Sequence, residues 1–207
     1  RVYATRRIGH GGTLDPMATG VLPVFVGRAT RGVEFFEHAE KTYDTVLLLG
    51  RTTDTQDVTG ATLAEKPVHL SPADIDRVLP RFRGDILQVP PMYSALKVNG
   101  KKLYELARKG QEVERQPRPI TVFELTNLGF DGTRLSLRVK CSKGTYIRTL
   151  CQDIGEALGC GGCMEALRRV RAGEYGIEDA VPLEQLLESE TPEQYLRGLD
   201  TMFAHCP

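Results

Sequence analysis

The chain has 207 residues, of which 41% are hydrophobic, a size and composition that suit one large domain or one domain with an inserted lobe. It carries 27 basic and 27 acidic residues, so its formal net charge is zero. No apolar run approaches the ~18 residues that a membrane-spanning helix needs, so we expect no membrane partner.

The charges are segregated along the chain. Residues 1–31 carry five Arg against one Asp, residues 97–118 seven basic residues against three Glu, and residues 134–148 five basic residues and no acid. Residues 178–200 form an acidic tail, with seven acids and one Arg. Local basic patches attract phosphates whatever the overall charge, so the pattern favours a nucleic-acid partner. Solvated surface charge is the alternative explanation.

The cysteines indicate reduced thiols and a cytoplasmic protein, because their number, five, is odd and the chain is long. Cys160 and Cys163 have the spacing of a zinc or redox pair. Since no second such pair and no nearby His accompany them, a four-ligand site cannot be assembled locally, and we expect no metal.

The stretch from Gly9 to Gly20 predicts a tight loop built around one acid. It contains four glycines, and Pro16 directly follows Asp15. A single carboxylate on such a braced turn is a candidate nucleophile or base. The alternative is an ordinary turn with a solvated Asp.

The next segments predict a short buried strand over 21–27 and a helix over 28–37 with Val33 and Phe36 inward. Alternation over 41–50 predicts a strand that enters the core, and residues 52–57 read as a polar loop. The residues of this strand that share one face are Tyr43, Thr45, Leu47 and Leu49.

Helix-start signals at Ser71, Pro72 and Asp74 predict a helix that runs to about Phe82. The later segments predict a strand over 86–89, a tight turn at Asn99-Gly100, a helix over 102–109, a strand over 134–141, a helix over 145–158, a strand over 167–171 and a helix from Pro182 to Leu187.

The strand over 134–141 has one apolar face and one basic face, which is typical of a sheet covered on one side. The order of elements shows no regular alternation of strand and helix. The sequence therefore predicts an α+β fold.

Six separated blocks occur in the order found in one known family, and together they span nearly the whole chain. The sequence resembles the TruB-type pseudouridine synthases, which isomerise a uridine in the T arm of tRNA. The blocks are His10 to Gly20, Tyr43 to Gly60, Pro90 to Gly110, Arg118 to Val122, Cys141 to Leu150 and Leu167 to Arg169.

The resemblance implies a mixed, largely antiparallel sheet flanked by helices, with a central RNA-binding cleft. It implies one catalytic domain over residues 1–207, with an RNA-gripping lobe inserted at about 65–118 and an acidic helical tail at about 178–207. The resemblance also leads us to expect that the start of the family's catalytic domain and a complete C-terminal RNA-binding domain are missing from this sequence. We expect a cofactor-free, monomeric enzyme that isomerises uridine 55 of tRNA without an obligate protein partner.

The resemblance also assigns roles to residues. Asp15 matches the family's essential aspartate, and Arg148 matches the arginine that pairs with it. Tyr43 matches a catalytic tyrosine that stacks on the flipped base, although its place in the strand equally suits plain core packing. Base flipping is needed because the reacting bond lies inside a folded arm.

The other matching residues are expected to bind the substrate. His10 would fill the space that the flipped uridine leaves, and Asp57 would complete the ionic network around Arg148. The remaining expected contacts are Tyr146 and Leu167, which line the base pocket, and Lys97, Lys101 and Lys102, which hold phosphates in the lobe.

Two other functions stay open at this point. One is a dyskerin-like pseudouridine synthase that works with a guide RNA. The other is a non-catalytic module that binds or folds tRNA.

Overall fold

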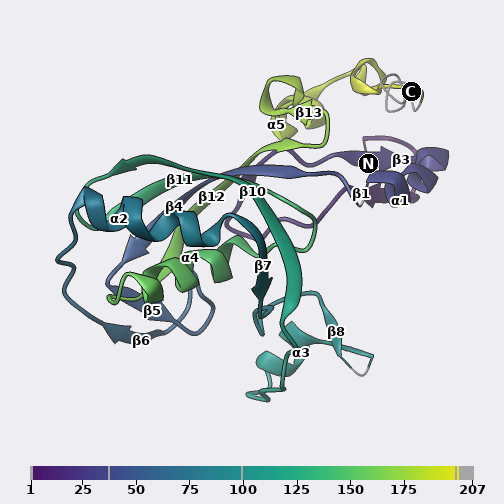
Figure 1. Ribbon diagram of the computed structural model, residues 1–207. Coiled ribbons are helices and arrows are strands. Elements are labelled where there is room, and N and C mark those ends of the chain that lie inside the picture. The colour runs from purple at the N-terminus through teal and green to yellow at the C-terminus, as the bar shows by residue number, and fades with distance from the viewer. Residues whose placement is uncertain (1, 37, 99, 199, 201–207) are drawn as a thin grey trace.

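The computed structural model describes residues 2–36, 38–98, 100–198 and 200, and its centre is a seven-stranded sheet (Figure 1). The strand order is β13-β12-β4-β11-β10-β7, and β2 pairs with β12 in parallel whereas the other pairs are antiparallel. This mixed, mostly antiparallel sheet confirms the α+β prediction. The strands are β2 (Thr19–Gly20), β4 (Lys41–Leu49), β7 (Gly84–Gln88), β10 (Arg118–Phe130), β11 (Arg134–Cys141), β12 (Gly162–Ala172) and β13 (Tyr175–Gly176).

The main core lies between this sheet and the helices α2 (Pro72–Val78) and α4 (Ile147–Ala157), which lie on the same side of it (Figure 1). Residues alternate between buried and partly exposed along β4, as predicted, and Leu47 is completely enclosed. Ile75 of α2 and Ile154 of α4 are equally inaccessible. Burial of these apolar faces is the main contribution to the stability of the fold.

The helix predicted from Ser71 is present. The Ser71 N–H donates to the Asp74 carboxylate at 2.9 Å, which closes a capping box, and a 3₁₀ turn over Leu79–Phe82 continues the α-helix. The helix α3 (Leu103–Ala107) is shorter than predicted. Residue 99 lies outside the described residues, so the predicted turn is seen only at Gly100, whose φ is +79°.

The long strand β10 was not predicted. Its pairing with β11 shifts register between Val122 and Glu124 and again between Asn127 and Gly129. Each shift moves the side chains to the other face, so the period of two that identifies a strand is lost. Strand β12 also begins five residues before the predicted start at Leu167.

The N-terminal segment forms a small unit beside the sheet. Strand β1 (Ile8–His10) pairs with β3 (Val24–Val26), and a 3₁₀ helix (Gly27–Gly32) leads into α1 (Val33–Phe36). The predicted strand over 21–27 is therefore shorter, and the predicted helix begins as a 3₁₀ helix, while its last residue, 37, lies outside the described residues. Phe36 is buried in a second apolar cluster, as predicted.

Residues 89–98 and 100–117 project from the sheet as a lobe that carries α3, β8 (Lys97–Val98) and β9 (Lys101–Lys102) (Figure 1). The predicted lobe of 65–118 also includes α2, but Ile75 of this helix belongs to the main core. A separate hairpin joins β5 (Arg51–Thr53) to β6 (Thr62–Glu65).

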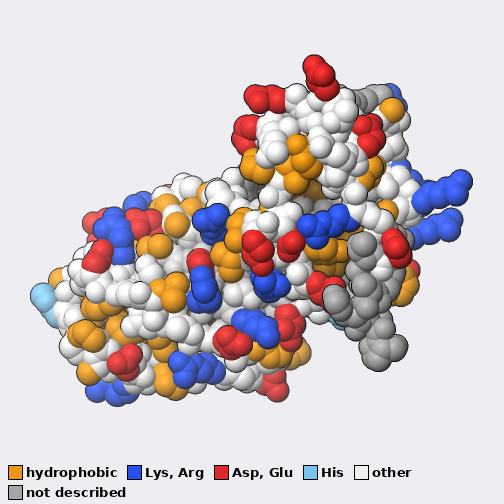
Figure 2. Space-filling model, turned by 90° about the horizontal axis from the view of Figure 1, so that it is seen from above, with side chains coloured by type: hydrophobic (Ala, Val, Ile, Leu, Met, Phe, Trp, Pro, Cys, Tyr) orange, Lys and Arg blue, Asp and Glu red, His pale blue; other side chains and the backbone are white. Residues whose placement is uncertain are grey.

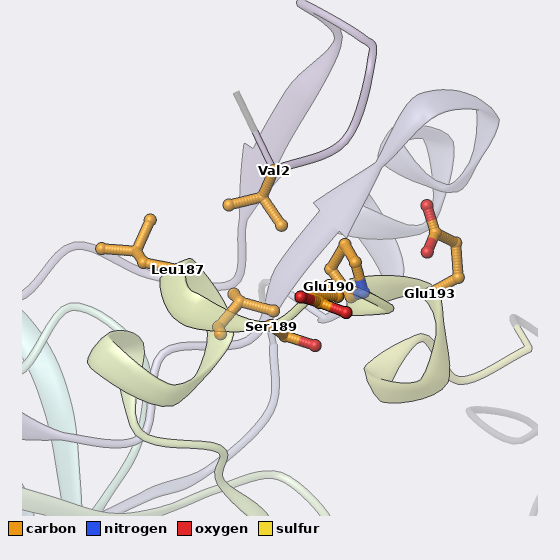
Figure 3. Close-up of a pocket in the computed structure, with 7 residues that line it drawn as sticks. Val2, Leu187, Ser189, Glu190 and Glu193 are labelled. Carbon is orange, nitrogen blue, oxygen red and sulfur yellow. The ribbon is translucent and has the colours of Figure 1, made fainter.

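The acidic tail consists of short helices: a 3₁₀ turn (Ile177–Asp179), α5 (Leu183–Glu188) and a 3₁₀ turn (Pro192–Tyr195). The Tyr3 hydroxyl donates to the carbonyl of Pro192 at 3.0 Å, and Val2 faces Leu187 across a hollow of about 370 Å³ (Figure 3). Glu190 and Glu193 line this hollow, so it does not suit phosphate groups. Residues 201–207 of the predicted tail lie outside the described residues, and none of the described helices has the length and apolar character for a bilayer span.

Candidate active site

Asp15 lies on the loop between β1 and β2. The Ala18 N–H donates to the Asp15 carbonyl at 2.9 Å, so the chain turns tightly just after this residue. Pro16 pre-sets the backbone angle of the turn. The local sequence therefore presents the Asp15 carboxylate from a short, closed turn, as predicted.

Arg148 lies in the first turn of α4 and points at this carboxylate. Its Nε donates to Asp15 Oδ2 at 2.8 Å and its Nη2 to Oδ1 at 2.9 Å. The same guanidinium donates to the carbonyls of Thr55, at 3.1 Å, and Tyr93, at 2.8 Å. The Arg148 side chain is 6% exposed and that of Asp15 30%, so the arginine is enclosed while part of the carboxylate stays open to a substrate.

Asp57 lies next to this pair and is buried. Its Oδ2 is 3.9 Å from Arg148 Nε, whereas its Oδ1 accepts hydrogen bonds from the Thr55 hydroxyl at 2.8 Å and the Thr59 N–H at 3.0 Å. Asp57 therefore shapes the loop that offers the Thr55 carbonyl to Arg148, and adds a second negative charge to the site.

Tyr43 projects from β4 into the main core and is 9% exposed. Burial raises the pKa of its phenol, the positive charge of Arg169 opposes this shift, and the negative charge of Asp15 adds to it. Tyr43 therefore lies both in the apolar core and near the Asp15 carboxylate. The first position suits core packing, and the second suits a role in the active site.

The other expected pocket residues lie around this centre. Tyr146 is the N-cap of α4, and Leu167 is buried in the same core as Tyr43. His10 is exposed at the end of β1, and its Nδ1 accepts a hydrogen bond from the Gly12 N–H at 3.4 Å, within the loop that carries Asp15.

The three lysines expected to hold phosphates lie in the projecting lobe. Lys97 and Lys102 are opposite each other in the β8–β9 pair, and Lys101 is exposed. Lys102 and Arg108 both approach the ring of Tyr104, at 5.4 Å and 5.3 Å from its centroid. No salt bridge of these lysines is found within the described part of the chain.

The basic face of β11 differs from the expected phosphate patch, because its charges are paired with acids. Basic and acidic side chains are interspersed in the view from above the molecule (Figure 2). The pairs are Arg134 with Glu165 at 2.7 Å, Arg138 with Asp44 at 2.7 Å, and Lys140 with Glu40 at 3.0 Å. These three charges are therefore less available to phosphates than the sequence suggests, and phosphate binding by this strand stays a prediction.

Two supporting residues were missed by sequence reasoning. Gln88 is buried and clamps the backbone of Tyr146: its amide nitrogen donates to the carbonyl at 3.1 Å, and its oxygen accepts from the N–H at 2.8 Å. No local signal could have identified it. Arg169 is completely enclosed, and a charged residue among core positions of β12 was the available signal.

The four cysteines within the described residues are free thiols. Burial raises the pKa of Cys141 to about 11 and that of Cys151 to about 12, and it also raises the pKa of Cys160 and Cys163. These thiols are poor nucleophiles near neutral pH. In the described ranges, no three His, Cys, Asp or Glu side chains are grouped so that they could hold a metal ion.

Comparison with models of known families shows to which protein family the chain belongs. The model described as "TruB family pseudouridylate synthase (N terminal domain)" matches residues 1–147. The chain belongs to the TruB family. A second model, for the C-terminal domain of tRNA pseudouridylate synthase B, matches residues 148–201. Asp15 thus lies in the part matched by the first model, and Arg148 is the first residue of the second.

Curated relatives carry the same family name. The chain is 48% identical to a "tRNA pseudouridine synthase B" of Azoarcus sp. (strain BH72), and it covers 70% of that protein. It is 52% identical to the protein of that name from Pseudomonas fluorescens (strain Pf0-1), over 87% of the chain and 59% of the relative. A third, from Syntrophomonas wolfei, is 53% identical over 97% of the chain and 69% of the relative.

Solved structures share the fold. A chain of a "Cbf5-Nop10-Gar1 Complex" matches 99% of this chain with a TM-score of 0.76 and 29% identity. A chain of an "H/ACA RNP bound to a substrate RNA containing 2'-deoxyuridine" matches 96% with a TM-score of 0.67 and 27% identity. This chain spans 55% and 50% of those two proteins.

Proposed function

We propose that this chain is the catalytic part of a tRNA pseudouridine synthase that converts uridine 55 in the T arm of tRNA to pseudouridine. In this isomerisation the bond from ribose C1′ to base N1 breaks, and the base turns. C1′ then bonds to C5, C5 loses its proton and N1 gains one. The atoms balance within the substrate, so the reaction consumes no co-substrate.

The observation that carries the proposal is the double hydrogen bond from enclosed Arg148 to partly open Asp15. A bidentate guanidinium holds a carboxylate in one plane, and fixed negative charge can act on an electron-poor ribose as a nucleophile or by electrostatics. Tyr43 lies in the same neighbourhood, where its ring can stack on a base and its phenolate form, once it has released its own proton to solvent, can accept the C5 proton. Burial raises the pKa of this phenol, and the positive charge of Arg169 opposes that shift and so favours the phenolate.

We further propose that His10 enters the space of the flipped uridine, because it is exposed on the loop that carries Asp15. The base pocket would be lined by Tyr146 and Leu167, and Asp57 would steady Arg148. The phosphate contacts would come from Lys97, Lys101 and Lys102. The lobe reaches the centre directly, since its Tyr93 carbonyl accepts from Arg148.

The guide-RNA alternative has less support, because the identities to the complex structures are 27–29%, against 48–53% to the three bacterial tRNA pseudouridine synthases. A monomer in the cytoplasm, acting on tRNA alone, remains our prediction. It implies that the purified chain acts on an unmodified tRNA transcript with no other RNA or protein.

The test is to map pseudouridine in such a transcript after incubation with this chain. A matched transcript with cytidine at position 55 controls for site specificity. We expect modification at position 55 of the first transcript and none in the second. Modification only after a guide RNA is added would support the dyskerin-like alternative instead.

A further inference from the structure

Arg169 of β12 is a buried cation that fastens the loop carrying Asp15. Of the described side chains that are less than 2% exposed, it has the largest volume. Its Nε donates to the Val21 carbonyl at 2.7 Å, and its Nη2 to the Gly12 carbonyl at 3.1 Å. Its Nη1 lies 3.5 Å from the carbonyl of Thr13. These carbonyls flank Asp15 on both sides, so one guanidinium ties the two ends of the loop together.

The backbone of Arg169 holds the same loop. The Val21 N–H donates to the Arg169 carbonyl at 2.8 Å, and β2 pairs with β12 with Gly20 opposite Arg169. Gly20 has a φ of +103°, and a Cβ there would lie 2.1 Å from the Arg169 carbonyl oxygen. The loop therefore closes directly on this residue, and only glycine fits at the point of contact.

Arg169 also neighbours Tyr43. The two residues are directly opposite in the antiparallel pairing of β12 with β4, an arrangement that places their side chains on the same face. Among the described residues, no Asp or Glu oxygen lies within salt-bridge distance of Arg169, although the side chain is enclosed. A buried charge without an opposite charge costs stability, which makes a functional reason for it worth testing.

We infer that Arg169 is a positioning residue, which keeps Asp15 and Tyr43 at a fixed separation by binding both ends of the Asp15 loop to the strand opposite Tyr43. This inference rests on the proposed function. Arg169 is enclosed by the protein, so the substrate meets Asp15 and Tyr43 and not the guanidinium. A misplacement of reacting groups by about 1 Å can lower a rate by about 100-fold, so a clamp of this kind has a measurable effect.

The test uses two variants of Arg169 and one control. Arg169→Met removes the hydrogen-bond donors, and Arg169→Lys keeps the positive charge but loses the planar guanidinium with its several donors. The control is Arg168→Met, which alters the exposed neighbour on the same strand. In both Arg169 variants we expect turnover to fall about 100-fold with tRNA affinity unchanged. Amide hydrogen exchange should become at least about tenfold faster at Gly11 and Val21, while exchange in β11 stays as it is.

A second readout does not need activity. The ultraviolet titration of Tyr43, obtained by subtracting the titration of the matching Tyr43→Phe protein, should move to higher pH in Arg169→Met, because the neighbouring positive charge that lowers this pKa is gone. In Arg169→Lys it should move less.

Unchanged loop exchange and an unchanged Tyr43 titration would overturn the inference. So would a uniform loss of protection over the whole sheet in both variants, because that is a general loss of stability. If Arg169→Met does not fold, Arg169→Lys decides. The exchange and titration results stand even if the wild-type chain makes no pseudouridine, so failure of the proposed function is distinguishable from failure of this inference.

Discussion

Arg148 donates two parallel hydrogen bonds, of 2.8 Å and 2.9 Å, to the Asp15 carboxylate, and its guanidinium is itself enclosed. Two further bonds, from Nη1 to the Thr55 carbonyl and from Nη2 to the Tyr93 carbonyl, also fix the guanidinium. The orientation of the carboxylate is therefore set by three chain segments at once. A fixed charge of this kind needs no reorganisation during a reaction.

Arg148→Lys keeps the positive charge but loses the planar guanidinium that donates two parallel bonds. We expect it to show that this geometry matters more than the charge. An ammonium cannot make two parallel bonds to Asp15 and also satisfy two carbonyls. We expect the conversion rate to fall about 100-fold and the free energy of unfolding to fall by about 1–3 kcal/mol. Single-turnover kinetics and denaturant unfolding measure the two effects, and Arg77→Lys, at an exposed ion pair of α2, is the matched control. A wild-type rate in Arg148→Lys would contradict this view.

Tyr43→Phe separates the hydroxyl from the ring. If the phenolate form of Tyr43 accepts the proton from C5, turnover should fall by about 10²–10⁴ with affinity for tRNA nearly unchanged. Tyr43→Leu should also lose stacking, worth about 1–3 kcal/mol of binding. Quantifying pseudouridine and tRNA binding in both variants tests this, with Tyr175→Phe as a control in the other apolar cluster. A fully active Phe variant would exclude proton transfer by Tyr43.

The dependence of tRNA affinity on salt concentration should distinguish the lobe lysines, which have no salt bridge among the described residues, from the basic residues of β11, which are paired with acids. Each phosphate that a lysine neutralises contributes about 0.7–0.9 log units of affinity per log unit of salt. Lys101→Ala with Lys102→Ala should flatten this slope for every tRNA. Arg134→Gln with Glu165→Gln removes an ion pair of β11 without a net change in charge, and should leave the slope unaltered. The reverse result would indicate that β11 contributes to the RNA-binding surface.

Asp153 on α4 makes a separate prediction about stability. Burial raises the pKa of its carboxyl to about 6, and the nearby charge of Glu156 adds to the rise. The folded state therefore favours the protonated form, so the cost of this carboxyl to stability grows as the pH rises from the ordinary pKa of 3.8 to about 6, and it is complete above that pH. Asp153→Asn should raise the free energy of unfolding by about 1 kcal/mol at a pH of about 7.5. The gain should shrink as the pH falls below about 6, and Asp76→Asn on the exposed face of α2 should show neither effect. A gain that is independent of pH would contradict this cause.

The sequence was sufficient to predict β4 and β11, because one face of each strand is buried and the residues alternate strictly. It was not sufficient for β10, whose register shifts interrupt the alternation. The ion pairs of β11 were also invisible, since Arg138 lies 94 residues from Asp44 and no local pattern links them.

The central residues of the candidate site could be named from the sequence, but the residues that hold them in place could not. Asp15 and Arg148 are 133 residues apart, and only the resemblance to a known family brought them together before the structure did. In the sequence Arg169 is one of three arginines of β12, and nothing local distinguishes its contacts from those of the other two. Its contacts with Gly12 and Val21 depend on how a distant loop packs on β12.

The most direct test of the account is single-turnover conversion of unmodified tRNA by Asp15→Asn, with binding measured on the same preparation. The substitution keeps the size and polarity of the side chain and removes its charge. Because phosphate contacts dominate affinity, we expect the variant to bind tRNA within about twofold of the wild-type chain and to form no pseudouridine, while the wild-type chain converts its substrate. Conversion at a near wild-type rate by Asp15→Asn, or binding without conversion by the wild-type chain, would contradict it.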